Sequence, residues 1–203
     1  MNKLLATLLL FGLMSGESFA DIIFGLGNDP GANQQNVLFG SFQSGSLVTG
    51  MTNQSRQIVD FSSITDTLVS TAKGQANLTA SDGLINDVTI RVPGGGAYTE
   101  LILNPFLGRA PAGMASVSVM TNDGAFLFQY PDGLGRGNNF LSVMATNAER
   151  ILSTRVDAVG GFEDLRQVRI DGISAVPEPA AIMLLGGGLL GLAALLSRRA
   201  RNS

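Results

Sequence analysis

Residues 84–92 read Leu-Ile-Asn-Asp-Val-Thr-Ile-Arg-Val, and their alternation decides the fold class. One side of an extended chain would carry Leu84, Val88, Ile90 and Val92, and the other would carry Asp87, Thr89 and Arg91. Successive side chains of a strand point to opposite faces, so this period of two predicts a half-buried β-strand. Residues 116–119 repeat the pattern, since Val117 and Val119 alternate with Ser116 and Ser118.

Similar short runs of β-branched and aromatic residues recur on both sides of this stretch, separated by Gly, Asn and Asp. Besides Leu84–Val92, the predicted strands are Ile22–Leu26, Asn36–Phe42, Ser46–Met51, Gln57–Phe61, Thr67–Thr71, Gln75–Ala80, Tyr98–Leu103, Met114–Thr121, Ala125–Tyr130, Asn139–Thr146, Ile151–Asp157 and Leu165–Ile173. Two turns, Ser81-Asp82-Gly83 and Asn122-Asp123-Gly124, are expected to supply the positive φ that tight hairpins require. Only Thr65–Lys73 and Ala145–Leu152 are candidates for short helices.

Many short strands with frequent turns predict an all-β domain, an antiparallel β-sandwich of jelly-roll-like form. A β-helix is the alternative, and the irregular strand spacing counts against it. The domain is expected to span residues 21–175, about 155 residues, which is enough for one real core. It carries nine basic and fourteen acidic side chains, a net charge near −5, which argues against a nucleic-acid partner.

The first twenty residues have the pattern of a secretory signal peptide. Lys3 precedes an apolar run from Leu4 to Met14, and small residues occupy the −3 and −1 positions of Ser18-Phe19-Ala20. Cleavage is therefore expected between Ala20 and Asp21. An uncleaved anchor is the alternative.

The other end of the chain combines three features in a fixed order. Val176-Pro177-Glu178-Pro179 comes first, then seventeen residues without charge from Ala180 to Leu196, then a basic end (197–203) with Arg198, Arg199 and Arg201. A helix of that length covers roughly 25 Å, close to the lower limit for crossing a bilayer core. Basic flanks stay cytoplasmic, so this predicts a C-terminal transmembrane helix with the C-terminus inside and the preceding domain outside. A buried core helix is the competing interpretation.

Proline favours extended geometry in the residue before it, so Val176 and Glu178 are expected to be extended and available to a processing enzyme. The whole stretch 176–203 resembles the PEP-CTERM sorting signal of Gram-negative bacteria. That resemblance implies recognition through Pro177, Glu178 and Pro179 by an exosortase, transient anchoring in the inner membrane, and an association with extracellular polysaccharide. An ordinary single-pass tail is the alternative.

A second resemblance concerns the end of the domain. Gly137-Asn138-Asn139-Phe140, followed by Phe162–Ile170, is similar to the closing segment of many PEP-CTERM surface proteins. It implies a last strand, with Val168 and Ile170 inward, that pairs with an earlier strand.

The composition limits the catalytic and metal-binding chemistry that the chain can perform. The chain has no histidine and no cysteine, so Ser-His-Asp and Cys-His units cannot form, and the usual zinc ligands are missing. Paired carboxylates for glycoside cleavage remain open, although no spacing selects a pair. No cofactor is predicted except calcium, for which Asn28-Asp29, Asp82, Asn122-Asp123 and Glu163-Asp164 put oxygen ligands in loops.

Two functions therefore compete at this stage. The first is an exported, non-catalytic cell-surface or extracellular-matrix protein, with polysaccharide as the expected partner or with a purely structural role. The second is a membrane-associated glycan hydrolase. The absence of histidine and of any convergent catalytic motif favours the first.

Overall fold

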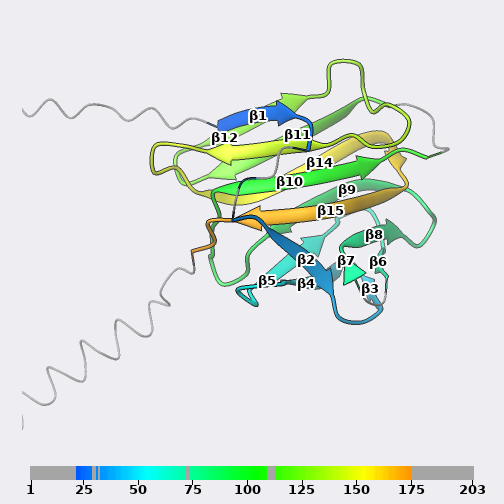
Figure 1. Cartoon of the computed structure of the whole chain (residues 1–203). Coiled ribbons are helices and arrows are strands. Elements are labelled where there is room, and N and C mark those ends of the chain that lie inside the picture. Colours follow the sequence, from blue (N-terminus) through cyan, green and yellow to red (C-terminus); the bar gives the residue numbers. More distant parts are fainter. Residues whose placement is uncertain (1–21, 29–30, 32, 72–73, 109–112, 175–203) are drawn as a thin grey trace, which may run out of the picture.

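The computed structural model describes residues 22–28, 31, 33–71, 74–108 and 113–174, and they form an all-β fold (Figure 1). No helix occurs in these ranges. The strands are β1 (Ile22–Leu26), β2 (Gln35–Phe39), β3 (Gln43–Gly45), β4 (Leu47–Thr52), β5 (Ile58–Ser62), β6 (Leu68–Ser70), β7 (Gly74–Gln75), β8 (Asn77–Ala80), β9 (Ile85–Arg91), β10 (Glu100–Phe106), β11 (Ala115–Thr121), β12 (Ala125–Gln129), β13 (Leu141–Ala145), β14 (Ile151–Phe162) and β15 (Asp164–Asp171).

The strands join into one sheet that nearly closes on itself. Its main path runs β1-β13-β10-β15-β2-β4-β5-β9-β14-β11-β12, with β3, β6, β7 and β8 off this path. The two end strands, β1 and β12, lie side by side in Figure 1. Between them the ring of Phe24 stacks on that of Phe128, with centroids 5.3 Å apart. The two end strands of the sheet are therefore joined by aromatic packing rather than by a ladder of backbone hydrogen bonds.

One apolar core fills the interior. It contains the inward residues of the predicted alternating strands, since Val88, Ile90, Val117 and Val119 are all fully buried. The largest buried side chains include Phe39, Phe61, Tyr98 and Phe162. Tyr98 keeps its hydroxyl satisfied in the core because it donates to Oγ1 of Thr154 at 2.9 Å.

The all-β class is confirmed, and each of the thirteen predicted segments overlaps a strand, although several bounds differ. The jelly-roll-like sandwich stays a prediction, because the observed arrangement is a single, nearly closed sheet. Every strand pair in the described part of the chain is antiparallel, which contradicts the alternative of a parallel β-helix.

The predictions of short helices at 65–73 and 145–152 are wrong. The segment 65–73 contains β6, whose backbone pairs with β3 and β8 instead of with its own preceding turn. The segment 145–152 leaves β13, makes a turn in which Glu149 N donates to Thr146 O at 2.9 Å, and enters β14. In the first segment neighbouring strands satisfy the backbone, and in the second a single turn and the start of β14 leave no room for a helix, so tertiary pairing overrides local propensity.

The two turns differ from their predictions. Gly83 does have a positive φ of 92°, but β8 and β9 do not pair with each other, so residues 81–83 carry the chain between separate strands. Asn122, Asp123 and Gly124 do join a hairpin, β11 to β12, without any positive φ. There Thr121 Oγ1 accepts from Asp123 N at 3.2 Å and from Gly124 N at 3.1 Å, so a side chain stabilises the turn.

The last strand expected at the end of the domain is confirmed, with its inward residues and its pairing. Val168 and Ile170 are fully buried, and β15 pairs with β10, β2 and β8. Residues 137–140 form a loop before β13 rather than strand. Asn139 stabilises that loop, because its Nδ2 donates to Pro105 O and Gly135 O at 2.9 and 2.8 Å.

Candidate functional site

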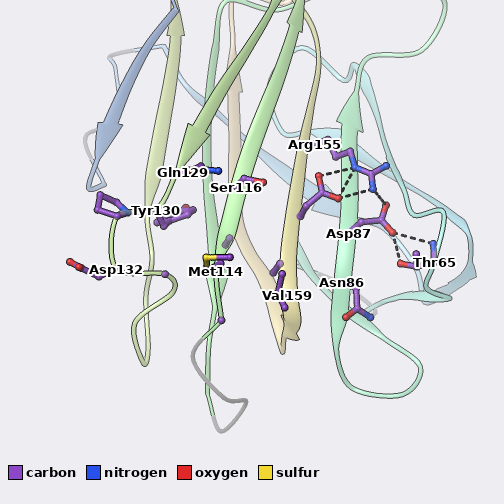
Figure 2. A pocket seen from close by; sticks show the side chains of 16 residues that line it. Thr65, Asn86, Asp87, Met114, Ser116, Gln129, Tyr130, Asp132, Arg155 and Val159 are labelled. Atoms are coloured by element: carbon purple, nitrogen blue, oxygen red, sulfur yellow. Dashed lines mark hydrogen bonds and ion pairs between the residues drawn. The ribbon is translucent and has the colours of Figure 1, made fainter.

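The described surface is hollowed on the outer face of β9, β14, β11 and β12 (Figure 2). The cavity has a volume of about 660 Å³. Ser116, Arg155 and Asp157 lie on its floor, pointing away from the core residues that alternate with them. Thr65, in the loop after β5, and the segment 131–133 after β12 bound it on opposite sides.

A bulge in β14 shapes one end of the hollow. The register of β14 on β9 jumps from Asp157↔Asp87 to Phe162↔Ile85, so several residues of β14 oppose one of β9. Gly160 and Gly161 take positive φ values of 82° and 73°, which suit glycine. Val159 is left 70% exposed at the rim.

Asp87 attaches the loop after β5 to β9. Its Oδ1 accepts hydrogen bonds from Ser63 Oγ at 2.8 Å, from Thr65 N at 3.1 Å and from Thr65 Oγ1. Its Oδ2 accepts from Ile64 N at 3.2 Å. The contacts cover the carboxylate, so Asp87 is only 2% exposed although the sequence places it on the polar face of its strand.

Asp66 reinforces the same attachment from the loop side. Its Oδ2 accepts from the backbone N of Asn86 at 2.8 Å, and its Oδ1 accepts from Asn86 Nδ2 at 3.0 Å. Burial by itself raises the pKa of both Asp66 and Asp87, but the donated hydrogen bonds outweigh it, and both pKa values fall below the ordinary value of 3.8. Both groups are therefore ionised at neutral pH.

Arg155 connects the two carboxylates of the floor. Its Nε donates to both oxygens of Asp157 at 2.9 Å, and its Nη2 donates to Asp157 Oδ1 at 2.7 Å. The same Nη2 lies 3.5 Å from Asp87 Oδ2 (Figure 2). Hydrogen bonding to Asp157 raises the pKa of Arg155 most, burial opposes this, and the two carboxylate charges add to the rise.

The opposite rim depends on close backbone packing. Val159 N donates to Met114 O at 2.9 Å, and Leu134 N donates to Gly113 O at 3.1 Å. A Cβ on Gly113 would lie 1.9 Å from Val159 O, so only glycine allows this approach. Tyr130 stands beside it, mostly buried, with its hydroxyl donating to Asn139 O at 3.1 Å, and burial raises its pKa.

The Asp66 and Asp87 carboxylates lead to a testable pH dependence. Since their pKa values are lowered in the folded state, they stabilise the fold above the ordinary value of 3.8, and this contribution is lost as the pH falls through the folded-state values below 3.8. We expect the thermal midpoint of the full chain in detergent, followed by circular dichroism, to drop steeply below about pH 4. Asp87→Asn should cost about 1–3 kcal/mol at pH 7 and flatten that drop. Parallel pH curves for parent and variant would contradict the assignment.

The calcium candidates predicted from loop sequences are used structurally here. Asp82 Oδ1 accepts from Leu84 N at 3.2 Å, Asn122 Oδ1 accepts from Arg150 N at 2.7 Å, and Asp164 pairs with Arg166. Asn28 Oδ1 accepts from Arg169 Nη1 at 2.6 Å, Glu163 directly precedes Asp164, and Asp29 is outside the described residues. Among the residues that the structure describes, no three acidic side chains gather into a metal site.

The predicted sorting and processing residues lie outside the described ranges. These are Ala20 and Asp21 at the expected cleavage site, Val176, Pro177, Glu178 and Pro179 in the motif, and Arg198, Arg199 and Arg201 at the basic end. The same holds for the signal peptide 1–20 and the expected transmembrane helix 180–196. Within the described ranges, no helix has the length and hydrophobicity needed to cross a membrane.

Comparison with known proteins decides the nature of the C-terminal stretch. Residues 175–199 match the family model of the PEP-CTERM protein-sorting motif. The chain carries a PEP-CTERM sorting motif. This motif supports an exported protein that an exosortase sorts and that is processed at the membrane. Comparison with curated proteins and with solved structures gave no match.

The hollow itself was not predicted from the sequence. Its residues come from loops and strands that are distant in the chain, such as Thr65, Asp87 and Arg155. One local signal was present, because Arg155 and Asp157 are two apart in a strand and so share a face. Another was Ser63-x-x-Asp66, where Asp66 N donates to Ser63 Oγ at 2.8 Å in a side-chain-stabilised turn.

Proposed function

We propose that the PEP-CTERM chain is a non-catalytic cell-surface or extracellular-matrix protein that binds extracellular polysaccharide in the hollow over β9, β14, β11 and β12. In this proposal residues 1–20 direct export, and residues 180–196 anchor a precursor in the inner membrane with Arg198, Arg199 and Arg201 in the cytoplasm. The exosortase then recognises Val176–Pro179 and releases the protein to the outside.

The observation that carries the binding proposal is the fixed set of polar groups in an open hollow. Arg155 and Asp157 hold each other in one orientation, with their side chains 31% and 42% exposed, so both remain accessible to a ligand. Ser116 and Gln129 are cross-strand neighbours beside them. Preorganised donors and acceptors of this kind suit sugar hydroxyls, and exposed Met114 and Val159 offer apolar contacts at the rim.

The electrostatics of the hollow favour binding over hydrolysis. A glycosidase needs one carboxyl group with a raised pKa as general acid beside a second carboxylate. Here the pKa of Asp87 is lowered and Arg155 contacts both Asp87 and Asp157. A lowered pKa makes Asp87 a poor general acid at neutral pH, which supports a non-catalytic role.

The full chain in detergent, incubated with the polysaccharide of its own host, tests this proposal. Retention of the polysaccharide supports binding, and shortened polysaccharide chains would support the alternative hydrolase. If neither retention nor shortening is seen, a structural role would be left. Replacing two lining residues, Met114→Ala with Gln129→Ala, should weaken retention about thirtyfold, since each lost contact is worth about 1 kcal/mol and about 1.4 kcal/mol corresponds to a factor of ten.

Leu127→Ala is the matched control for this double variant. Leu127 is on β12 like Gln129 and is 64% exposed, but it does not line the hollow. Its removal should leave retention unchanged. Equal losses in the double variant and in the control would place polysaccharide binding elsewhere.

A further inference from the structure

The hollow over β9, β14, β11 and β12 carries more negative than positive charge. Among the described residues that line it, Asp87, Asp132 and Asp157 are acidic, and Arg155 is the one basic residue. A cleft lined mainly by one sign of charge, with a low dielectric beneath it, concentrates the electric field and attracts the opposite sign. The lining therefore favours ligands with positive charge over ligands with negative charge.

The single basic group of the described lining is already bound by carboxylates. Arg155 Nε and Nη2 donate to Asp157, and Nη2 also lies 3.5 Å from Asp87 Oδ2. Arg91, on the same face of β9 as Asp87, pairs with Asp60 at 3.5 Å. A glycan carboxylate or sulfate that approached Arg155 would also meet the two aspartates around it, and such like-charge contacts are unfavourable.

Two of the acidic groups keep room for a ligand. The Asp157 side chain is 42% exposed, and within the described residues its Oδ2 accepts one hydrogen bond, from Arg155 Nε. Asp132 is exposed in the segment after β12, on the opposite side of the hollow from Arg155 (Figure 2). An ammonium group has three N–H donors and no acceptor, so each of these carboxylates can receive one.

Neutral polar groups lie beside these carboxylates. In the register of the sheet Asp157 faces Ser116 on β11, and Ser116 faces Gln129 on β12. Sugar hydroxyls can exchange hydrogen bonds with the hydroxyl and the amide there. The lining is thus acidic on both sides and neutral between them, which matches a chain of sugars that carries amino groups at intervals among its hydroxyls.

We propose that the hollow selects polysaccharides with free amino groups, the positively charged amino-sugar polymers, over polymers that carry carboxylate or sulfate groups. This inference rests on the proposed polysaccharide binding and adds the chemical class of the sugar. In the complex, ammonium groups pair with Asp132 and Asp157, and hydroxyls contact Ser116 and Gln129, all of which line the hollow. Charge complementarity of this kind sets specificity more than affinity, so it predicts a preference among glycans.

Titration calorimetry of the full chain in detergent with three soluble oligosaccharides tests the selection. The three are a chitosan oligomer with free amines, its fully N-acetylated counterpart of the same length, and an alginate oligomer with carboxylates. At about pH 5.5, where the sugar amines are protonated, the chitosan oligomer should bind about tenfold more tightly than its N-acetylated counterpart, and the alginate oligomer should bind most weakly. Salt at about 0.5 M should remove most of this preference, because it screens exposed charges.

Two variants and a control locate the preference. Asp132→Asn with Asp157→Asn should remove it, so that the chitosan oligomer and its N-acetylated counterpart bind alike. Asp132→Asn alone, at an exposed position, should fold normally and reduce the preference about threefold. Asp123→Asn is the matched control, because this exposed acid lies in the turn between β11 and β12, outside the hollow, and its loss changes the charge of the chain as much as Asp132→Asn does. It should keep the full preference.

Equal binding of the chitosan oligomer and its N-acetylated counterpart to the parent chain, or tighter binding of the alginate oligomer, would overturn the selection and leave polysaccharide binding in place. A preference that survives in the double variant, or that falls as much in Asp123→Asn as in Asp132→Asn, would overturn it too, because the charge of the hollow would not decide it. If none of the three oligomers binds while the host polysaccharide is retained, the selection is wrong. If the host polysaccharide is not retained either, the proposed binding fails with it.

Discussion

Replacing both prolines of the sorting motif, Pro177→Ala with Pro179→Ala, is expected to stop maturation of the exported chain. Proline lacks a backbone N–H and favours extended geometry in the residue before it, whereas alanine has the highest helix propensity, so the double variant should favour helix over an extended motif. A processing enzyme that binds an extended strip would then lose its substrate. We expect the mature form in the extracellular fraction to fall more than about tenfold, with uncleaved precursor accumulating in the membrane fraction, as measured by immunoblotting.

Pro131→Ala serves as the matched control, because this proline lines the hollow and lies far from the motif in sequence. It should mature normally. If the double variant also matured normally, the C-terminal stretch would act only as a plain single-pass anchor. A reporter fused after Ser203 tests the orientation, since it should remain in the cytoplasm.

Phe61→Ala is expected to have the largest effect on stability. Phe61 is fully buried on β5, and its ring packs on that of Phe39 with centroids 5.4 Å apart. Truncation removes the ring and leaves a cavity between strands, at a cost of about 3–5 kcal/mol. This is a large part of the roughly 5–15 kcal/mol that stabilises a typical domain. Thermal or denaturant unfolding of the full chain in detergent should show it.

Ile58→Ala is the matched control on the same strand. Ile58 is also a large apolar residue but is 43% exposed, so its truncation should cost less than about 1 kcal/mol. Equal losses for the two variants would mean that the inner and outer faces of β5 are wrongly assigned.

Strand positions were largely predictable because the pattern that encodes them is local. The alternation in residues 84–92 and 116–119 reports which side chains point inward, and Val88, Ile90, Val117 and Val119 are buried as expected. The C-terminal motif was predictable for a similar reason, since its composition and order are contained in one short stretch that the sorting-motif family model also matches.

Strand partners were not predictable, because pairing depends on contacts between residues far apart in the chain. The turn at Ser81–Gly83 has hairpin chemistry, yet β8 and β9 take other partners. The segment 65–73 has no clear period, and only its pairing with β3 and β8 makes part of it a strand. Local propensity is weak compared with the backbone hydrogen bonds that the assembled sheet supplies.

The sequence by itself determined the all-β class, the inward face of each alternating strand and the sorting motif, because residues close together in the chain encode each of them. Only the tertiary structure decided that Asp87 is buried and that Arg155 joins it to Asp157. The physical reason is that the environment of a charged side chain depends on whatever distant segment covers it. For Asp87 that segment is the loop with Ser63 and Thr65, more than twenty residues earlier in the chain.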